Sequence, residues 1–367
     1  MQSQILPVAI VDSFTRDHSL GGLSFSHGES VEAFVGDVPT VPFNVDKHIT
    51  TADPFKAYSL ALIELRNSIS AGSQYSALNL SSGVPIRIDV LGKVLDLKLN
   101  RHNLNENRGT ILQRFSEAPQ RLDKITNLLL HNPELKKELA ISWEIPEYKV
   151  TGELEKSLIL FATSASILEV LELLKEMTDK KVNVFIGAGN SGKHFVSLFT
   201  FAQGANVIKS GSKSFTEPYS MDNDLITGAA QGTFWLAARN INGNDVLVID
   251  SPGCRDIPCD RKPTSLSSKL EIYPFSELKR VLQKEVLETP WIEPEIAQLL
   301  GSGNPKELPD YFTVTNSPFT LSFFDAVDGK LQESTKFVYL LYGTSIASPL
   351  FARNYLLNDP AKTVLQS

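Results

Sequence analysis

The sequence predicts an α/β protein built on an open, mostly parallel β-sheet. Short apolar runs typical of buried parallel strands occur at 5–12, 75–83 and 182–187. Amphipathic helical segments at 53–70 and 167–178 lie between them, because apolar residues recur there every three to four positions. Strands that alternate with helices favour a parallel sheet, whose ligands bind at the carboxyl ends of its strands.

Length and composition limit the classes of function. The 367 residues suffice for one large or two medium domains, and 42% hydrophobic with 21% charged residues are globular values. A net charge of −7 disfavours nucleic acid as a partner, because it implies no basic face. No apolar run reaches the roughly 18 residues of a membrane span.

The N-terminus and the cysteines bear on the compartment. Residues 1–7 lack the basic and long apolar regions of a signal peptide. We therefore expect a cytosolic protein, one exported by a signal-less route, or a processed form. The two cysteines, Cys254 and Cys259, are too few for a disulfide framework or a structural zinc site. Two reduced thiols are expected, with a local disulfide as the alternative.

The first strand and the segment after it carry two candidate residues. The strand ends in Asp12, at the edge where a catalytic carboxylate would sit, although this side chain could equally cap the next turn. A helix is predicted to begin near His27, because Ser26 and Glu29 have capping-box spacing. A lone histidine in a first helical turn is more often a surface residue.

The next strands bring small residues to the same sheet edge. Residues 38–46 contain two prolines and predict a short, bent strand. The strand at 75–83 ends in small residues, and a competing strand at 157–164 does so too. We prefer the strand at 75–83 as the one that borders the candidate site, because a helix precedes it. Its small residues are Ser81, Ser82 and Gly83.

Residues 84–155 fit this alternation least, and we expect an insertion there within a single domain spanning 1–367. The insertion holds a β-like segment at 86–99, a polar turn at 100–108 and a helix at about 118–130. It is expected to determine substrate choice, to occlude the site, or to bind a regulatory partner.

The stretch Gly187–Lys193 permits two interpretations. It fits the phosphate-binding pattern Gly-x-x-x-x-Gly-Lys, and 245–253 is similar to a strand with a magnesium-binding Asp, which together suggest a nucleotide-dependent switch. Against this, His194 replaces the Ser or Thr that would ligate Mg²⁺, and no base-reading Asn-Lys-x-Asp follows. The second interpretation is what the family resemblance described below implies, namely a loop of small residues that contacts a substrate backbone.

A serine near the C-terminus has the setting of a nucleophile. Residues 342–349, Tyr-Gly-Thr-Ser-Ile-Ala-Ser-Pro, follow an apolar strand at 337–341 and precede a predicted helix at 350–357. Ser345 lies between a glycine turn and a helix start, where free N–H groups favour developing negative charge. Pro349 suits a first helical turn. The plainer interpretation is a loop and a helix cap.

Together these stretches resemble the subtilases, the subtilisin-like serine peptidases. The serine block matches closely and the oxyanion block moderately, while the remaining blocks match weakly. All follow the family's order, over most of 5–83 and 157–357. In chain order the blocks are Asp12, 26–28, 79–83, 187–192, 245–253 and 343–349.

The resemblance implies a three-layer fold, with helices on both faces of a mostly parallel central sheet and an inserted α/β segment. It implies a serine endopeptidase acting on extended polypeptide. Ser345 would be the nucleophile, His27 its general base and Asp12 the residue that orients the imidazole. Asn190 and the Ser345 N–H would form the oxyanion hole.

Further implications concern the substrate, metals and a pro-segment. No metal is needed, and no Asp-rich loop specifies the structural Ca²⁺ that family members often carry. Because the first strand is predicted to start near Ile5, we expect a chain without the family's pro-segment, either because it was removed or because the protein folds without one. The residues expected to contact substrate are Ser81, Ser82, Gly83, Gly187, Ala188 and Gly189.

The chain departs from the family pattern in two places. Glu29 stands where the family has Thr, which is expected to change the substrate subsites next to His27. His27 follows Asp12 by only 15 positions, so the link between them is expected to be nearly minimal. A catalytically silent subtilase fold used for binding or regulation is therefore the main alternative. The nucleotide switch is disfavoured because it leaves Asp12, His27 and Ser345 unexplained.

Overall fold

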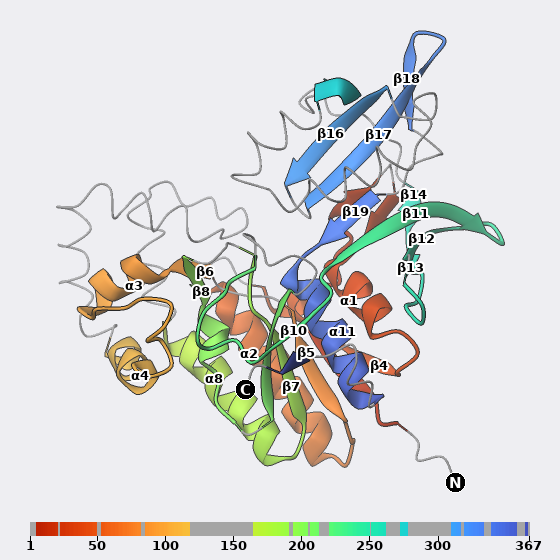
Figure 1. The fold of residues 1–367 in the computed structure, drawn as a ribbon. Coiled ribbons are helices and arrows are strands. Elements are labelled where there is room, and N and C mark those ends of the chain that lie inside the picture. Colours follow the sequence, from red (N-terminus) through yellow and green to blue (C-terminus); the bar gives the residue numbers. More distant parts are fainter. Residues whose placement is uncertain are drawn as a thin grey trace.

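A seven-stranded β-sheet forms the centre of the molecule (Figure 1). Its strand order is β20-β10-β9-β7-β5-β1-β4. All neighbouring strands are parallel except β20, which runs antiparallel to β10. The predicted mostly parallel sheet is confirmed. The strands are β1 (Val8–Asp12), β4 (Thr40–Asn44), β5 (Ala77–Leu80), β7 (Asn183–Gly187), β9 (Val207–Ser212), β10 (Gly228–Ala230) and β20 (Val364–Leu365).

The structure of the chain is a computed structural model. It describes residues 5–20, 23–49, 53–81, 85–117, 164–190, 194–204, 206–212, 220–249, 251–261, 272–277, 310–316, 319–333, 339–357 and 364–365.

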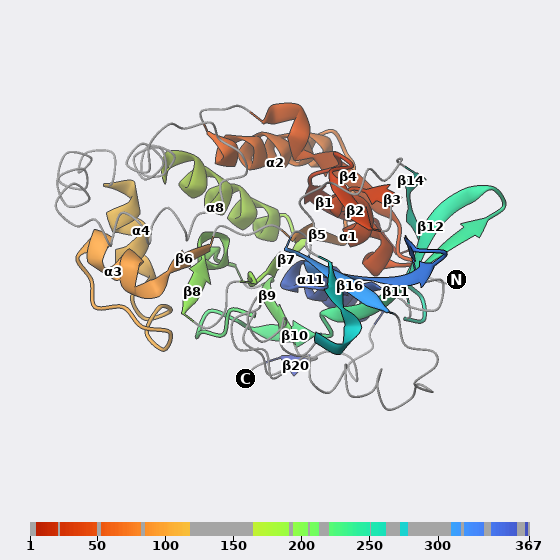
Figure 2. The ribbon, with the colours of Figure 1, turned by 90° about the horizontal axis from the view of Figure 1, so that it is seen from above.

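Helices cover both faces of the central sheet, because successive residues of a strand point to opposite sides. Ala9 and Val11 of β1 share a core with α2 (Pro54–Ser70) and α8 (Ser164–Asp179). Val8 and Ile10 share a second core with α1 (His27–Val35) and α11 (Thr344–Leu356). Figure 2 shows these helix pairs on opposite sides of the strands. The three-layer α/β arrangement is confirmed.

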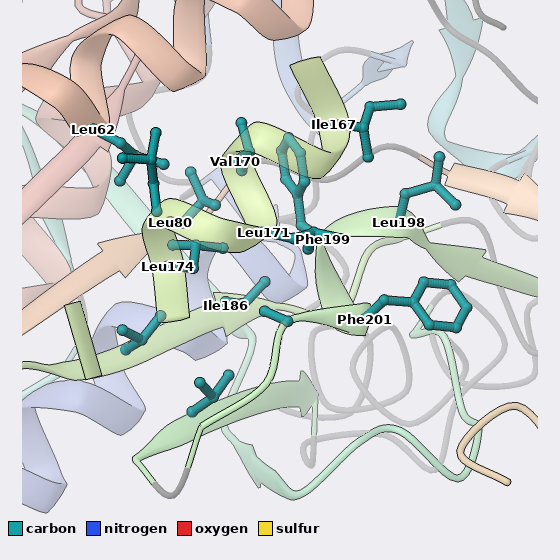
Figure 3. Close-up of a cluster of buried hydrophobic side chains, with 14 of the residues drawn as sticks. Leu62, Leu80, Ile167, Val170, Leu171, Leu174, Ile186, Leu198, Phe199 and Phe201 are labelled. Atoms are coloured by element: carbon teal, nitrogen blue, oxygen red, sulfur yellow. The ribbon is translucent and has the colours of Figure 1, made fainter. Parts of the chain in front are cut away.

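The core under α8 shows why the predicted helix at 167–178 forms. Leu171 and Leu174 lie one turn apart on the face that points to the sheet, close to Ile186 of β7 and Leu80 of β5 (Figure 3). Each such buried leucine contributes about 1.5–3 kcal/mol to folding. The apolar spacing of this segment therefore decides both its helical form and its position.

The order of the strands locates the edge where a site is expected. From β1 the chain passes to β4 on one side, and then returns to β5 on the other side of β1. In open α/β sheets ligands bind at the carboxyl ends of the strands, where the order reverses in this way. Asp12 ends β1 and Ser81 follows β5, so both lie at that point.

Four smaller antiparallel sheets in the described part of the chain have the orders β13-β12-β11-β19, β14-β3-β2, β15-β16-β17-β18 and β6-β8. The predicted strands at 245–253 and 337–341 correspond to β12 and β19, which both pair with β11. The bounds are β2 (His18–Leu20), β3 (Leu23–Phe25), β6 (Pro85–Arg87), β8 (Phe195–Ser197), β11 (Thr233–Ile241), β12 (Asn244–Ile249), β13 (Ile257–Pro258), β14 (Asp260–Arg261), β15 (Tyr273–Pro274), β16 (Tyr311–Asn316), β17 (Phe319–Val327), β18 (Lys330–Glu333) and β19 (Tyr339–Tyr342). The 3-10 turns are η1 (Val45–His48), η3 (Leu198–Phe201) and η4 (Phe275–Glu277).

The first part of the expected insertion differs from its prediction. The β-like segment at 86–99 is wrong, because only its start lies in β6 and α3 (Ile88–Leu95) follows. Leu91 and Leu95, four positions apart, are both buried, which is a helical pattern. A further helix, α4 (Arg108–Ser116), follows the polar turn. The predicted helix at 118–130 lies outside the described residues, as does most of the competing strand at 157–164.

Candidate active site

Asp12 is buried at the carboxyl end of β1, and its carboxylate is fixed by the loop that follows. The Ser13 N–H donates to Asp12 Oδ1 over 2.7 Å. The loop itself is held by Asp46 of η1, whose Oδ2 accepts from the N–H groups of Phe14 and Thr15, each over 2.7 Å. Asp12 Oδ2 is buried and has no hydrogen-bond partner among the described residues.

The link from Asp12 to His27 is not a minimal loop, because it contains a β-hairpin made of β2 and β3. β3 also pairs with β14, which ties the hairpin to residues 260–261. Arg16 braces the arrangement, with Nε 3.0 Å from the Glu29 carboxylate and Nη1 2.6 Å from Asp260 Oδ2. These two carboxylates raise the pKa of Arg16.

Glu29 bonds to groups of the protein itself. Its Oε2 accepts from the Ser26 N–H over 2.8 Å, and the Ser26 hydroxyl accepts from the Glu29 N–H over 3.0 Å. This is the predicted capping box, and it is confirmed. The side chain of Glu29 is 17% exposed and paired with Arg16. It stabilises the start of α1, and its effect on substrate subsites stays a prediction.

His27, the first residue of α1, contacts Asp12 directly. Its Nδ1 lies 2.7 Å from Asp12 Oδ1, so Nδ1 carries the proton that the carboxylate accepts and Nε2 is left as an acceptor. Burial of the ring disfavours the imidazolium. The charge and hydrogen bond of Asp12 outweigh that cost, with a contribution from Asp17, and raise the pKa of His27 above its ordinary value.

The Ser345 segment forms the second half of the candidate site. Helix α11 begins at Thr344 rather than at 350, so Pro349 lies inside the helix and the expected position of Pro349 in the first turn is wrong. Ser345 is the second helical residue and is partly exposed. Its N–H donates to no acceptor in the described ranges, as expected for a group in a first helical turn.

Thr344 fixes the orientation of Asn190. The Thr344 N–H donates to Asn190 Oδ1 over 2.7 Å, and the Thr344 hydroxyl accepts from the Gly189 N–H over 2.8 Å. The amide Nδ2 of Asn190 is thereby turned toward Gly343. A methyl group at Gly343 would lie 2.9 Å from that nitrogen and 3.1 Å from Ser345 Oγ. The small space beside Gly343 therefore faces both groups.

Buried polar side chains hold α11 in place from below. The Ser348 hydroxyl donates to Asn79 Oδ1 over 2.8 Å, and Asn79 Nδ2 donates to Ser81 Oγ over 2.6 Å. All three side chains are buried. This chain of hydrogen bonds joins the helix that carries Ser345 to the strand end at Ser81. The supporting roles of Ser348 and Asn79 were not predicted from the sequence, although Asn79 is a polar residue inside an apolar strand and was a signal.

The two halves meet without a direct hydrogen bond between their reactive side chains. Helices α1 and α11 share a core, since Val31 and Val35 pack with Ala347 and Phe351. Both helices begin at the carboxyl edge of the sheet. No hydrogen bond joins Ser345 Oγ to His27 within the part of the chain described. Such bonds are often long in unliganded enzymes and shorten when substrate binds.

Close packing within the protein already requires small residues at the positions expected to contact substrate. A methyl group at Gly187 would lie 3.0 Å from the Ser81 carbonyl oxygen, and one at Gly189 (φ +104°) would meet the Met221 side chain at 2.5 Å. Ala188 is buried in a cluster with Met221. Their contact with substrate stays a prediction, and Ser82 and Gly83 lie outside the described residues.

The nucleotide interpretation lacks the helix that it needs. A phosphate-binding loop joins a strand to a helix whose N-terminus holds the phosphates. Residues 194–204 instead contain strand β8 and the 3-10 turn η3. Lys193 lies outside the described residues. Among the described residues, β7 is therefore followed by strand β8 and not by a helix.

The described ranges meet the requirements neither of a metal site nor of a membrane-spanning helix. There, no group of three or more His, Cys, Asp or Glu side chains could hold a metal ion. Within those same ranges no helix is both long and apolar enough to span a bilayer. The thiols of Cys254 and Cys259 are not joined, and burial raises the pKa of Cys259 to about 12.

Comparison with known proteins adds little. No protein-family model matches the chain, and no curated protein matches it. A solved structure described as the crystal structure of a lanthipeptide protease is similar with a TM-score of 0.32 and 14% sequence identity. The match covers 96% of this chain and 73% of that one. A likeness of this size supports no conclusion about function, which rests on the site itself.

Proposed function

We propose that the protein is a subtilisin-like serine endopeptidase that hydrolyses peptide bonds of extended polypeptides. The observation that carries the proposal is the 2.7 Å contact between His27 Nδ1 and buried Asp12 at the carboxyl edge of the sheet. At the same edge Ser345 stands in the first turn of α11. An oriented imidazole beside a helix whose first turn carries a partly exposed serine is the arrangement nucleophilic catalysis needs.

The chemistry follows from these positions. In the first step His27 Nε2 accepts the Ser345 hydroxyl proton while Ser345 Oγ attacks the scissile carbonyl carbon. Asp12 stabilises the imidazolium that forms. His27 then gives that proton to the leaving amine, and an acyl ester remains on Ser345. Water, deprotonated by the same imidazole, hydrolyses the ester and frees the serine.

The oxyanion that forms in each step needs two donors. The Ser345 N–H has no other acceptor among the described residues, and the Asn190 amide faces the space beside Gly343. Together they would donate to the tetrahedral oxygen. Because Thr344 already fixes Asn190 Oδ1, little reorganisation is needed when the charge develops.

Labelling with a fluorophosphonate serine-hydrolase probe tests the proposal. The modified peptide is located by mass spectrometry in the wild type, Ser345→Ala and His27→Ala. We expect labelling at Ser345 that both substitutions abolish, because the hydroxyl needs its base. Ser116→Ala is the matched control, since Ser116 is an exposed helical serine on α4 that bonds only to the Gln113 carbonyl oxygen.

Two outcomes would contradict the proposal. One is a folded wild type that is not labelled at Ser345. The other is labelling that survives His27→Ala unchanged, since Ser345 would then react without the assigned base. A folded but unreactive protein that keeps its cellular role as Ser345→Ala would support the silent, regulatory alternative.

A further inference from the structure

A second histidine, His18, lies beside the candidate general base. The β2–β3 hairpin places His18 directly opposite Phe25, so the two side chains stand on the same face. The His18 ring centroid is 5.8 Å from that of Phe25 and 5.9 Å from that of His27, with an interplanar angle of 64° to the His27 ring. His18 therefore packs between a buried core ring and the imidazole that contacts Asp12.

We propose that His18 is a positioning residue: its neutral ring holds the His27 imidazole against Asp12 and accommodates the positive charge that His27 gains during catalysis. The inference rests on the proposed function for its catalytic meaning. The β2–β3 hairpin between Asp12 and His27 would then serve to place His18 beside His27.

The charges around the two rings favour this role. The titratable groups that face His18 are Asp17 next to it, Asp12 from β1 and His27 from α1, whereas β3 presents the apolar ring of Phe25. Asp17 Oδ1 lies 3.7 Å from His18 Nε2. Burial and the charge of His27 lower the pKa of His18, and the two carboxylates offset part of that effect. Protonation therefore favours His27.

A neutral ring and a charged ring at this position would act oppositely on His27. A cation within about 6 Å of the face of a neutral aromatic ring is attracted to that ring. A cation about 6 Å from the imidazolium would repel it, in surroundings less polar than water. A phenylalanine at position 18 should therefore preserve the arrangement, and a lysine should oppose it.

Histidine NMR titration tests the electrostatic part without needing turnover. It is performed on Ser345→Ala protein, alone and combined with His18→Phe or His18→Lys. We expect His18→Phe to leave the pKa of His27 within about half a unit, and His18→Lys to lower it by about one unit. His102→Lys adds the same charge on the exposed turn before α4 and should leave the titration unchanged.

Asp17→Asn covers the case in which the lysine variant does not fold. Asp17 is an exposed carboxylate whose charge raises the pKa of both imidazoles, so its loss should lower the pKa of His27 slightly. Unchanged titration of His27 in both His18→Lys and Asp17→Asn would overturn the electrostatic part of the inference.

Steady-state kinetics on a peptide substrate tests the positioning part. We expect His18→Ala to lower kcat about tenfold with little change in KM, because a displaced imidazole slows proton transfer but not binding. His18→Phe should restore most of that loss. Equal activity of wild type and His18→Ala, or equal damage by Phe and Ala, would overturn the inference. A wild type that the fluorophosphonate does not label would instead refute the proposed function.

Discussion

The two halves of the candidate site are held in different ways. Charged groups hold the acid–base half: Asp46 fixes the loop after Asp12, and Arg16 joins Glu29 to Asp260. Neutral hydrogen bonds hold the nucleophile half, from Thr344 to Asn190 and from Ser348 through Asn79 to Ser81. In the proposed mechanism the first half responds to the charge of an imidazole, whereas the second stays fixed while charge develops beside it. Substitutions in the two halves should therefore differ in their dependence on pH and salt.

The largest expected effect is that of Asp12→Asn in the acid–base half. It should lower kcat about 10⁴-fold, because an amide no longer selects the tautomer that leaves Nε2 free. In the wild type, kcat/KM should rise with pH through the raised pKa of His27, since the neutral imidazole is the base. Without the Asp12 charge this midpoint should move to lower pH.

The measurement is kcat/KM from pH 5 to 9 for both proteins. A decrease in kcat below about tenfold, or an unchanged midpoint of the acid limb of kcat/KM, would show that Asp12 does not orient His27.

The next effect belongs to the nucleophile half. Asn190→Ala should lower kcat about 10²–10³-fold by removing one oxyanion donor. Because no titrating group is changed, the pH profile should fall in parallel at every pH. Circular dichroism would verify that the fold is kept, since Asn190 is exposed. A profile that changes shape would show that Asn190 acts on the ionisation of His27 instead.

Ser348→Ala probes the support beneath α11. It leaves Asn79 Oδ1 buried without a donor, so we expect a loss of about 1–3 kcal/mol in the free energy of unfolding, measured by urea titration. The loss should not depend on salt, because no charge is involved. Ser116→Ala on the exposed face of α4 is the control and should change stability little.

Glu29→Gln should have the smallest effect and the clearest salt dependence. Gln at this position keeps the capping box but loses the charge that pairs with Arg16. We expect a loss of about 1 kcal/mol in low salt that shrinks in about 1 M salt. Glu169→Gln, which breaks the more exposed pair with Lys56, should cost less. A salt-independent loss would show that Glu29 acts through its cap alone.

Local patterns were predictable from the sequence, and long-range pairing was not. The capping box at Ser26 and the helices at 53–70 and 167–178 depend on neighbours within a few positions, and all are present. The segment at 86–99 misled because its β-branched residues and alternating tail hid a helical spacing. After the helix ends, the chain at Leu97 packs against Gly92. A methyl group at Gly92 would lie only 2.7 Å from the Leu97 carbonyl oxygen, so this contact needs a glycine.

The candidate site was predictable as a set of residues but not as an arrangement. Asp12 and His27 were named from the sequence, and the structure joins them. The hairpin that sets their separation depends on β14, more than two hundred positions away. Thr344 bonds to Asn190 in the loop after β7, and Asn79 bonds to Ser348 on α11. Such roles arise from tertiary contacts, which a single sequence does not reveal.

The place of α11 in the chain order determines when the candidate site can first be complete. During synthesis the ribosome releases β1, β5, β7, β9 and β10 before it releases α11. Until then the face formed by Ile10, Phe185 and Ile208 lacks the cover of Ala347 and Phe351. A nascent chain at that stage could pair Asp12 with His27, but it would carry no nucleophile. Under the proposed function, the chain could not cut itself or its neighbours before α11 closes the core, and the apolar face would stay uncovered until that point.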